Sequence, residues 1–162
     1  MKKLLSITAI SLLLSGCFSS VDLPNSNSYS SPNIQLSSNE SGFLGTHLAI
    51  ASACIGSRAK TADKWSDLKK DFAAFVQQID DNSRESVISR FANYFSFYMK
   101  ERHIPLTVEN AIQLSQHTVT DRKLDYDIAQ AFLKQKPSKM NPCGTVNEVK
   151  IAFKQLVASK MH

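Results

Sequence analysis

From Gly42 to the end of the chain, apolar residues recur every three or four positions, the spacing that places them on one face of an α-helix. Five or six such segments follow one another, and each carries an apolar stripe that must pack against a neighbour to leave water. No segment alternates apolar and polar residues as a half-buried strand does. The pattern therefore predicts an all-α fold, a small bundle of five to six helices over residues 42–162.

Capping residues divide this pattern into separate helices. Thr145-Val146-Asn147-Glu148 has the form of a capping box, in which Thr145 and Glu148 would satisfy free backbone N–H groups at the start of the last helix. The second helix is expected to end near residues 80–82, and Pro105 to stop the third. The remaining expected caps, for the third, fourth and fifth helices, are Ser83, Thr107 and Thr120.

The first sixteen residues have the form of a bacterial export signal, with Lys2 and Lys3 before an apolar run that is too short to span a membrane. The next four-residue motif, Leu14-Ser15-Gly16-Cys17, resembles a lipobox. That resemblance implies that residues 1–16 are removed and that Cys17 is acylated and anchors the protein. The alternative is an ordinary export signal with an unrelated cysteine.

Two features bear on where the anchored protein goes. Bacterial lipoproteins retained at the inner membrane usually carry Asp after the lipidated cysteine, whereas here Phe18 and Ser19 follow it. The resemblance therefore implies the outer membrane, with the chain held by its lipid and not crossing the bilayer. Without Lys2 and Lys3 the formal net charge falls from +5 to +3, too mild to imply nucleic acid.

Residues 17–41 combine the lipidated cysteine with a stretch dominated by Ser and Asn. Phe18 to Ser41 contains nine Ser and four Asn but only two charged residues, a composition that cannot bury enough apolar surface to fold. We expect a disordered tether that lets the helical domain move relative to the membrane. The alternative is that its isolated apolar residues dock on the domain or on a partner; they are Val21, Leu23, Ile34 and Leu36.

Two cysteines remain once Cys17 is lipidated, Cys54 in the first helix and Cys143 before the last. In an oxidising periplasm such a pair is expected to form a disulfide, which would staple the two ends of the helical domain. A metal pair or a reactive thiol is the alternative. Neither cysteine has another Cys or a His at ligand spacing, so we expect no metal site.

Motifs for catalysis are sparse. Ser57 with Lys60 and Ser66 with Lys69 each fit S-x-x-K, but the companion S-D-N and K-T-G motifs of penicillin-recognising enzymes are missing. Asp125 and Asp127 lie two apart on a helix and do not share a face. We therefore predict no enzyme, no catalytic residues, no cofactor and no small-molecule substrate.

The histidines have structural explanations. His47 lies near the apolar edge of the first helix, where a partly buried, hydrogen-bonded histidine is expected. His103 and His117 fall at expected helix ends, where a cation meets the negative end of the helix dipole. None of the three suggests a ligand set.

Aromatic residues on the third helix are the candidate partner-binding residues. On a helical wheel Phe97 falls about 60° outside the main apolar face, so we propose Phe97 with Tyr94 as a partner-binding pair. The alternative is that Phe97 packs under another helix. Ile151, on the far side of the last helix, poses the same question.

The plan of the whole chain resembles the helical pilotins of type II secretion. The matching features are the lipobox at Cys17, the polar tether, the small helical domain, and Cys54 with Cys143 directly before the last helix. The resemblance implies a Cys54–Cys143 disulfide and a groove that binds a helical segment of a secretin, which is then carried to the outer membrane. The stretch between the cysteines is long for that family, so no groove residues are carried over. The alternative is an envelope lipoprotein that binds another protein as an exclusion, inhibitor or scaffold module.

Overall fold

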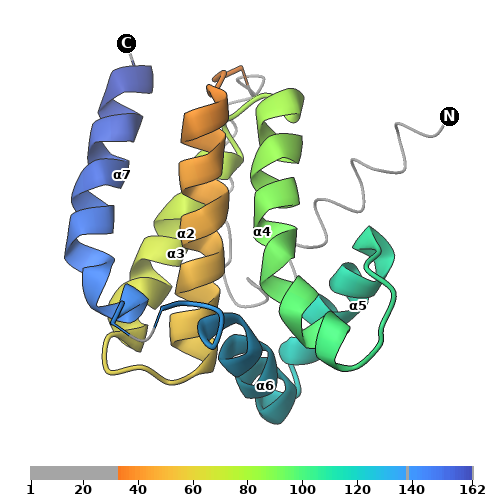
Figure 1. Cartoon of the computed structure of the whole chain (residues 1–162). Helices are drawn as coiled ribbons and strands as arrows, with labels where there is room; N and C mark the ends of the chain where they lie inside the picture. Colours follow the sequence, from red (N-terminus) through yellow and green to blue (C-terminus); the bar gives the residue numbers. More distant parts are fainter. Residues whose placement is uncertain (1–32, 138, 162) are drawn as a thin grey trace, which may run out of the picture.

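The computed structural model describes residues 33–137 and 139–161, and in them the chain folds into a small all-α bundle (Figure 1). The all-α prediction is therefore confirmed. The predicted export signal, Cys17 and the expected tether up to residue 32 lie outside the described residues. The helices are α2 (Ser38–Gly56), α3 (Ala62–Val76), α4 (Asp81–Glu101), α5 (Val108–Thr118), α6 (Arg122–Leu133) and α7 (Val146–Lys160), with a 3₁₀ turn η1 (Pro142–Thr145) before α7.

Helix α2 forms the centre of the bundle and packs against α3, α4 and α6 (Figure 1). Small residues on α2 let its neighbours approach closely. At Gly45 a Cβ atom would lie 2.6 Å from the carbonyl oxygen of Val87, so α4 crosses α2 almost backbone to backbone. The buried residues of α2 occupy most of its circumference, which is why its sequence reads as small and apolar; they include Leu44, Leu48, Ala49, Ala51, Ala53 and Cys54.

The first helix begins earlier than the sequence analysis predicts. Residues up to Ser41 were assigned to a disordered tether, but α2 starts at Ser38 and Ser41 is 1% exposed. A capping box fixes this start, because Glu40 N–H donates to Ser37 Oγ at 3.2 Å and Ser37 N–H donates to Glu40 Oε2 at 2.7 Å. The first helix therefore starts at Ser38, ahead of the residue 42 at which the sequence analysis places the start of the helical pattern.

The residues before α2 also belong to the folded domain. Ile34 pairs with Ile79 in an isolated parallel bridge, and Leu36 N–H donates to Ser83 Oγ at 2.9 Å. Ile34 and Leu36 pack against the core, which agrees with the docking alternative for these two residues. Because Ser83 accepts this bond from inside α4, it is not the cap; Asp80 caps α4 by accepting from Ser83 N–H at 2.8 Å.

The other expected caps are partly right. Thr107 caps α5 as predicted, accepting from Asn110 N–H at 3.2 Å. Asp121, not Thr120, caps α6. The predicted capping box at Thr145 is wrong, because the Thr145 hydroxyl donates to the carbonyl of Pro142 at 2.7 Å and makes no cap bond to α7. The second helix also ends at Val76, earlier than residues 80–82.

Ser37, which caps α2, and Thr145, which caps no helix, give a matched prediction. Ser37→Ala removes a side-chain acceptor from the start of α2 and is expected to lower the free energy of unfolding by about 1 kcal/mol. Thr145→Ala removes an exposed hydroxyl that caps no helix, so its effect is expected to stay within about 0.5 kcal/mol. Urea unfolding of the two variants measures both. Equal losses would show that the Ser37 box does not hold the start of α2.

The predicted disulfide forms between Cys54 and Cys143, whose Cα atoms lie 5.5 Å apart. Two side chains of the α3 region hold the second cysteine by its backbone: Thr61 Oγ1 and Trp65 Nε1 donate to the Cys143 carbonyl at 2.7 and 2.9 Å. Trp65 is fully buried, so its N–H requires such an acceptor. The covalent bond and these two hydrogen bonds together join η1 to the C-terminal end of α2 and the start of α3.

In the part of the chain that the structure describes, no helix combines the length and apolar character needed to cross a membrane.

Candidate partner-binding face

The structure places the two predicted partner-binding residues differently. Tyr94 is 2% exposed and packs among Phe91, Phe95 and Phe132, with ring centroids 5.0 to 6.1 Å away. It belongs to the core and does not offer a surface to a partner. Phe97 is half-buried and lies 6.2 Å from the Phe132 ring, so helix α6 covers much of the side that the helical wheel left open.

A different surface, between α2 and α7, carries half-buried apolar side chains. Figure 1 shows α7 standing beside α2, with α3 behind. Helix α7 packs mainly on α3 and η1. Its anchor is Phe153, whose ring meets Phe72 and Phe75 of α3 edge-on at 4.7 and 5.7 Å.

Beyond this anchor the upper part of α7 is only partly covered. Leu156 and Val157 are half-buried and touch the edge of the core, while the two residues before them and the two after them are exposed. On α2 the half-buried residues Phe43 and His47 stack on one another, with ring centroids 4.4 Å apart. We name the surface formed by Phe43, His47, Phe153, Leu156 and Val157 the α2–α7 face.

The His47 side chain at this face is oriented by a hydrogen bond and has a lowered pKa. Its Nδ1–H donates to the carbonyl of Phe43 at 2.7 Å, one turn earlier in α2. Burial lowers the pKa of His47 below its ordinary value, and the nearby charge of Lys136 lowers it further, against the opposing effect of the Phe43 hydrogen bond. At neutral pH the ring therefore adds apolar and polarisable surface to the face rather than charge. The expectation of a partly buried, hydrogen-bonded histidine is confirmed.

Both ends of the α2–α7 face are closed by bonds between the elements that form it. At the base, the Cys54–Cys143 disulfide joins α2 to the segment that leads into α7. At the top, Lys160 of α7 pairs with Glu40 of α2 at 2.9 Å. Both side chains are largely shielded, which strengthens the pair relative to an exposed one. These two links join α7 to α2 near the two ends of the α2–α7 face.

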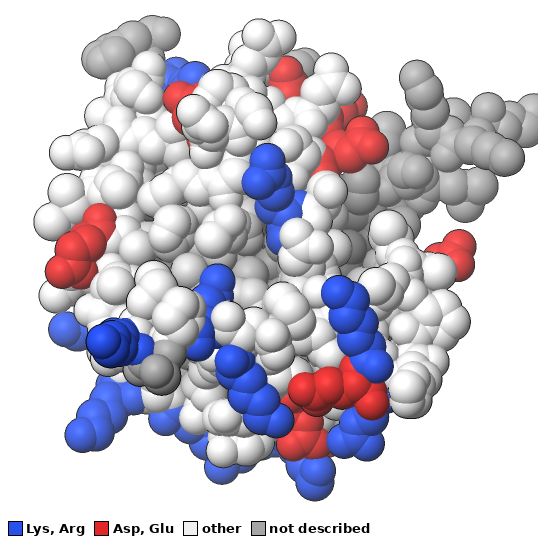
Figure 2. All heavy atoms as spheres, in the orientation of Figure 1, with Lys and Arg blue, Asp and Glu red and all other residues white. Residues whose placement is uncertain are grey.

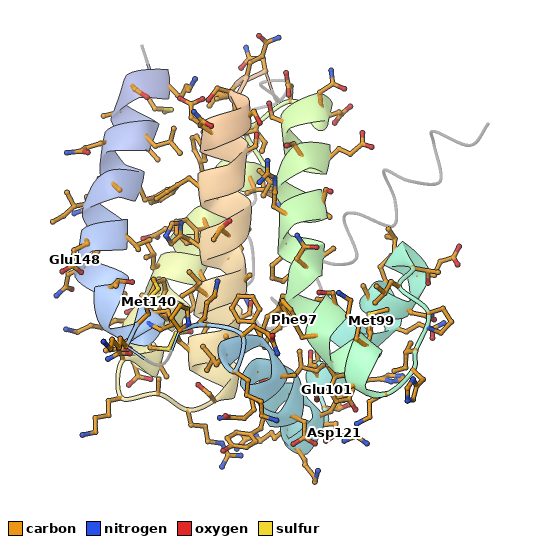
Figure 3. All side chains as sticks on the ribbon, in the orientation of Figure 1. Phe97, Met99, Glu101, Asp121, Met140 and Glu148 are labelled. Atoms are coloured by element: carbon orange, nitrogen blue, oxygen red, sulfur yellow. A yellow bond between two sulfur atoms is a disulfide. The ribbon has the colours of Figure 1, made fainter. Side chains whose placement is uncertain are left out.

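The outer side of α7 points to solvent. Ile151 is 59% exposed, so the sequence expectation that it lies off the packed side is correct. Glu148 lies on the same outward side of α7 in Figure 3, and Met140, 61% exposed, lies near the base of the helix. A single exposed isoleucine beside a carboxylate is ordinary surface, so this side of α7 is a weaker candidate than the α2–α7 face.

Several of the residues considered for catalysis can be placed in the described part of the chain. The Ser57 hydroxyl donates to the Cys54 carbonyl at 3.5 Å, and Lys60 is exposed. Asp127 pairs with Lys123 at 2.7 Å. Asp125, by contrast, is half-buried beside α2, where burial raises the pKa of its carboxyl and Lys69 partly offsets this effect.

The other polar candidates have local roles. His117 lies in the last turn of α5, as expected for a helix end. His103 follows α4 with a positive φ of 56°, so it closes the helix end by its backbone conformation. Among the described residues no group of three or more His, Cys, Asp or Glu side chains is arranged to hold a metal ion.

Helical periodicity alone does not mark Phe43 and His47 as surface residues of a site. The signal that could have found them is the S-x-x-E motif from Ser37 to Glu40, which sets the start of α2 and places Phe43 in its second turn. The sequence does not predict the position of α7. The packing of Phe153 on α3 determines which side of α7 faces α2.

The fold and the site thus define a small α-helical domain stapled by one disulfide, with an apolar face between its first and last described helices. Comparison of the chain with protein-family models, with curated proteins and with solved structures gives no match.

Proposed function

We propose that the protein is a non-enzymatic, lipid-anchored outer-membrane lipoprotein that acts as a pilotin or assembly factor. It binds a helical segment of a secretin subunit and carries that subunit to the outer membrane. Support for the anchor comes from the lipobox at Cys17, and support for the binding module comes from the stapled helical domain. The single observation that carries the binding role is the half-buried α2–α7 face.

The α2–α7 face suits an amphipathic helix. Helix α7 has 15 residues and is about 22 Å long, so a partner helix of about four turns can lie along it. Such a partner would place apolar residues at three- and four-residue spacing against Phe43, Leu156 and Val157. The α2–α7 face lies mostly in an uncharged part of the surface in Figure 2, so apolar contact rather than ion pairing would supply the affinity.

The mechanism requires binding and transport only. A secretin segment without a stable structure of its own becomes helical on the α2–α7 face, and the acyl chains on Cys17 direct the complex through lipoprotein sorting to the outer membrane. Several acyl chains bury enough CH₂ groups, at about 0.8 kcal/mol each, to hold the complex at a leaflet. No bond in the cargo is made or broken.

Site-specific photocrosslinking in cells tests the binding face. A photoreactive phenylalanine analogue is introduced at Phe43 or at Val157, one on each wall of the face, in the full-length lipoprotein. The matched control is the same analogue at Leu106, which is 56% exposed and lies between α4 and α5, away from the face. Mass spectrometry then identifies the adducts in the membrane fraction.

A secretin subunit attached at Phe43 and Val157 but not at Leu106 is the expected result. If a different envelope protein is attached at the same two positions, the binding face is supported but the partner is not a secretin. That result is expected for a scaffold, inhibitor or exclusion lipoprotein. Adducts at Leu106 as abundant as those at Phe43 would contradict the assignment of the face.

A further inference from the structure

The positive charge of the domain is concentrated at one end of the bundle. This basic end comprises residues 57–64, 100–102, 121–137 and 139–140, where the α2–α3 turn, the end of α4, and α6 with the segment after it lie together (Figure 1). It contains ten Lys and Arg against five Asp and Glu, whereas the other described residues contain seven against eight. Figure 2 shows the same asymmetry, with Lys and Arg side chains gathered over the lower part of the molecule.

Most of these cations are available to an external partner. Nine of the ten are exposed and Lys136 is half-buried. Within the described residues, the ion pair at this end is Lys123–Asp127 at 2.7 Å. Aromatic rings lie under three of the cations: Lys100 over Phe97 at 5.9 Å, Arg102 over Tyr98 at 5.3 Å and Lys136 over Phe132 at 5.0 Å.

An exposed aromatic and an exposed apolar side chain lie among the charges of the basic end. Tyr126 on α6 is 41% exposed and Met140, after the lysine-rich loop, is 61% exposed. Cations interspersed with exposed aromatic and apolar side chains are typical of surfaces that meet the headgroup layer of a membrane. The cations come from three separate segments spread over one end of the bundle, which fits a broad, flat partner better than a single acidic peptide.

We propose that the basic end docks on the anionic phospholipid headgroups of the leaflet to which the protein is anchored. This proposal takes its location from the lipid anchor of the proposed function, but it does not depend on a secretin. Each lysine near an anionic surface contributes to binding electrostatically, and the contributions add over the patch. The lipid on Cys17 and the basic end would then act as two attachments of one domain.

The chain is long enough for both attachments. The described residues begin at 33. Ile34 pairs with Ile79 at the end of the bundle opposite the basic end. From Cys17 to Pro32 there are sixteen residues, which span at most about 55 Å when fully extended. Helix α2, with 19 residues, is about 28 Å long. The basic end can therefore rest on the same leaflet. In that orientation α2 and α7 point away from the membrane, and the α2–α7 face is open to a partner.

Vesicle co-sedimentation of a lipid-free form tests this directly. The chain from residue 17 onward, with Cys17→Ser, is exported to the periplasm by a signal that is not a lipoprotein signal, so that the disulfide forms without acylation. Vesicles of phosphatidylethanolamine with phosphatidylglycerol are compared with vesicles of phosphatidylcholine alone. The test variant carries Lys134→Gln, Lys136→Gln and Lys139→Gln. The matched control removes three exposed lysines elsewhere: Lys70→Gln, Lys150→Gln and Lys154→Gln.

We expect binding to the anionic vesicles only, weakened by added salt because the attraction is electrostatic. Each lysine removed from the basic end is expected to weaken binding about fivefold, so the test variant falls on the order of a hundredfold while the control stays within a few-fold of the parent. Circular dichroism confirms that both variants keep the helical fold.

Equal binding to both kinds of vesicle, no binding to either, or equal losses in the two variants would overturn the proposal. None of these outcomes bears on the crosslinking of a secretin to Phe43, so the two proposals fail separately.

Discussion

Replacing both Cys54 and Cys143 by Ala is expected to lower the free energy of unfolding by about 4–5 kcal/mol. The two cysteines are 89 positions apart, so the bond closes most of the helical domain into one loop and removes a large amount of chain entropy from the unfolded state. A stable small domain has only about 5–15 kcal/mol in total. The variant is therefore expected to be close to unfolding at physiological temperature.

Urea unfolding followed by circular dichroism measures this loss, on the chain from residue 17 onward. Cys17→Ser is the matched control, because it removes a cysteine that takes no part in the disulfide and is expected to leave the unfolding curve unchanged. Reduction of the parent protein is expected to reproduce the double variant. A loss below about 1 kcal/mol would show that the hydrogen bonds of Thr61 and Trp65 to Cys143 hold η1 without the covalent bond.

Gly45→Ala is expected to destabilise the bundle by about 2–3 kcal/mol although alanine is the better helix former. A Cβ at Gly45 meets the Cβ of Arg90 inside van der Waals contact and the carbonyl oxygen of Val87 at 2.6 Å. The second contact is with backbone, so a side-chain rotation cannot relieve it. Helices α2 and α4 must move apart, which disturbs the most extensive helix contact of the domain.

Gly42→Ala, one turn earlier on the same helix, is the matched control. There the nearest atom to an added Cβ is the Arg90 guanidinium nitrogen at 3.7 Å, an ordinary contact. Helix propensity then determines the effect, and the free energy of unfolding of the variant is expected to rise by about 0.5–1 kcal/mol. Thermal unfolding of the two variants should move in opposite directions. Equal shifts of the same sign would mean that α2 and α4 are not packed as closely as the structure has them.

The sequence predicts much of this fold because its signals are local. Apolar residues at helical spacing mark every helix of the bundle, and assigning Cys17 to the predicted lipobox leaves Cys54 and Cys143 as one pair. Both predictions are confirmed. They depend on local sequence patterns and on the expectation of an oxidising compartment, not on how the helices are arranged in space.

The errors have physical causes that lie outside those local signals. Ser37 and Glu40 lie in a Ser- and Asn-rich stretch whose composition masks a capping box, so composition alone places the start of the first helix too late. At the last helix, the η1 turn gives the Thr145 hydroxyl a nearer acceptor, the Pro142 carbonyl, and the predicted box does not form.

The candidate site shows the same limit more sharply. A helical wheel places Phe97 relative to its own helix, but the position of Phe132 on α6 decides how much of Phe97 is exposed. Tyr94, proposed with Phe97 as a partner-binding pair, is buried in the core. The α2–α7 face depends on where α7 settles against α3, a tertiary contact that no single helix encodes.

The most direct test of the proposed function is the distribution of the secretin in cells that lack this protein. Outer and inner membranes of the native strain and of the deletion strain are separated, and the secretin is quantified in each fraction. The account predicts that the secretin leaves the outer-membrane fraction in the deletion strain, that the full-length protein restores it, and that Cys17→Ser does not. A secretin distribution that is unchanged by the deletion would contradict the account.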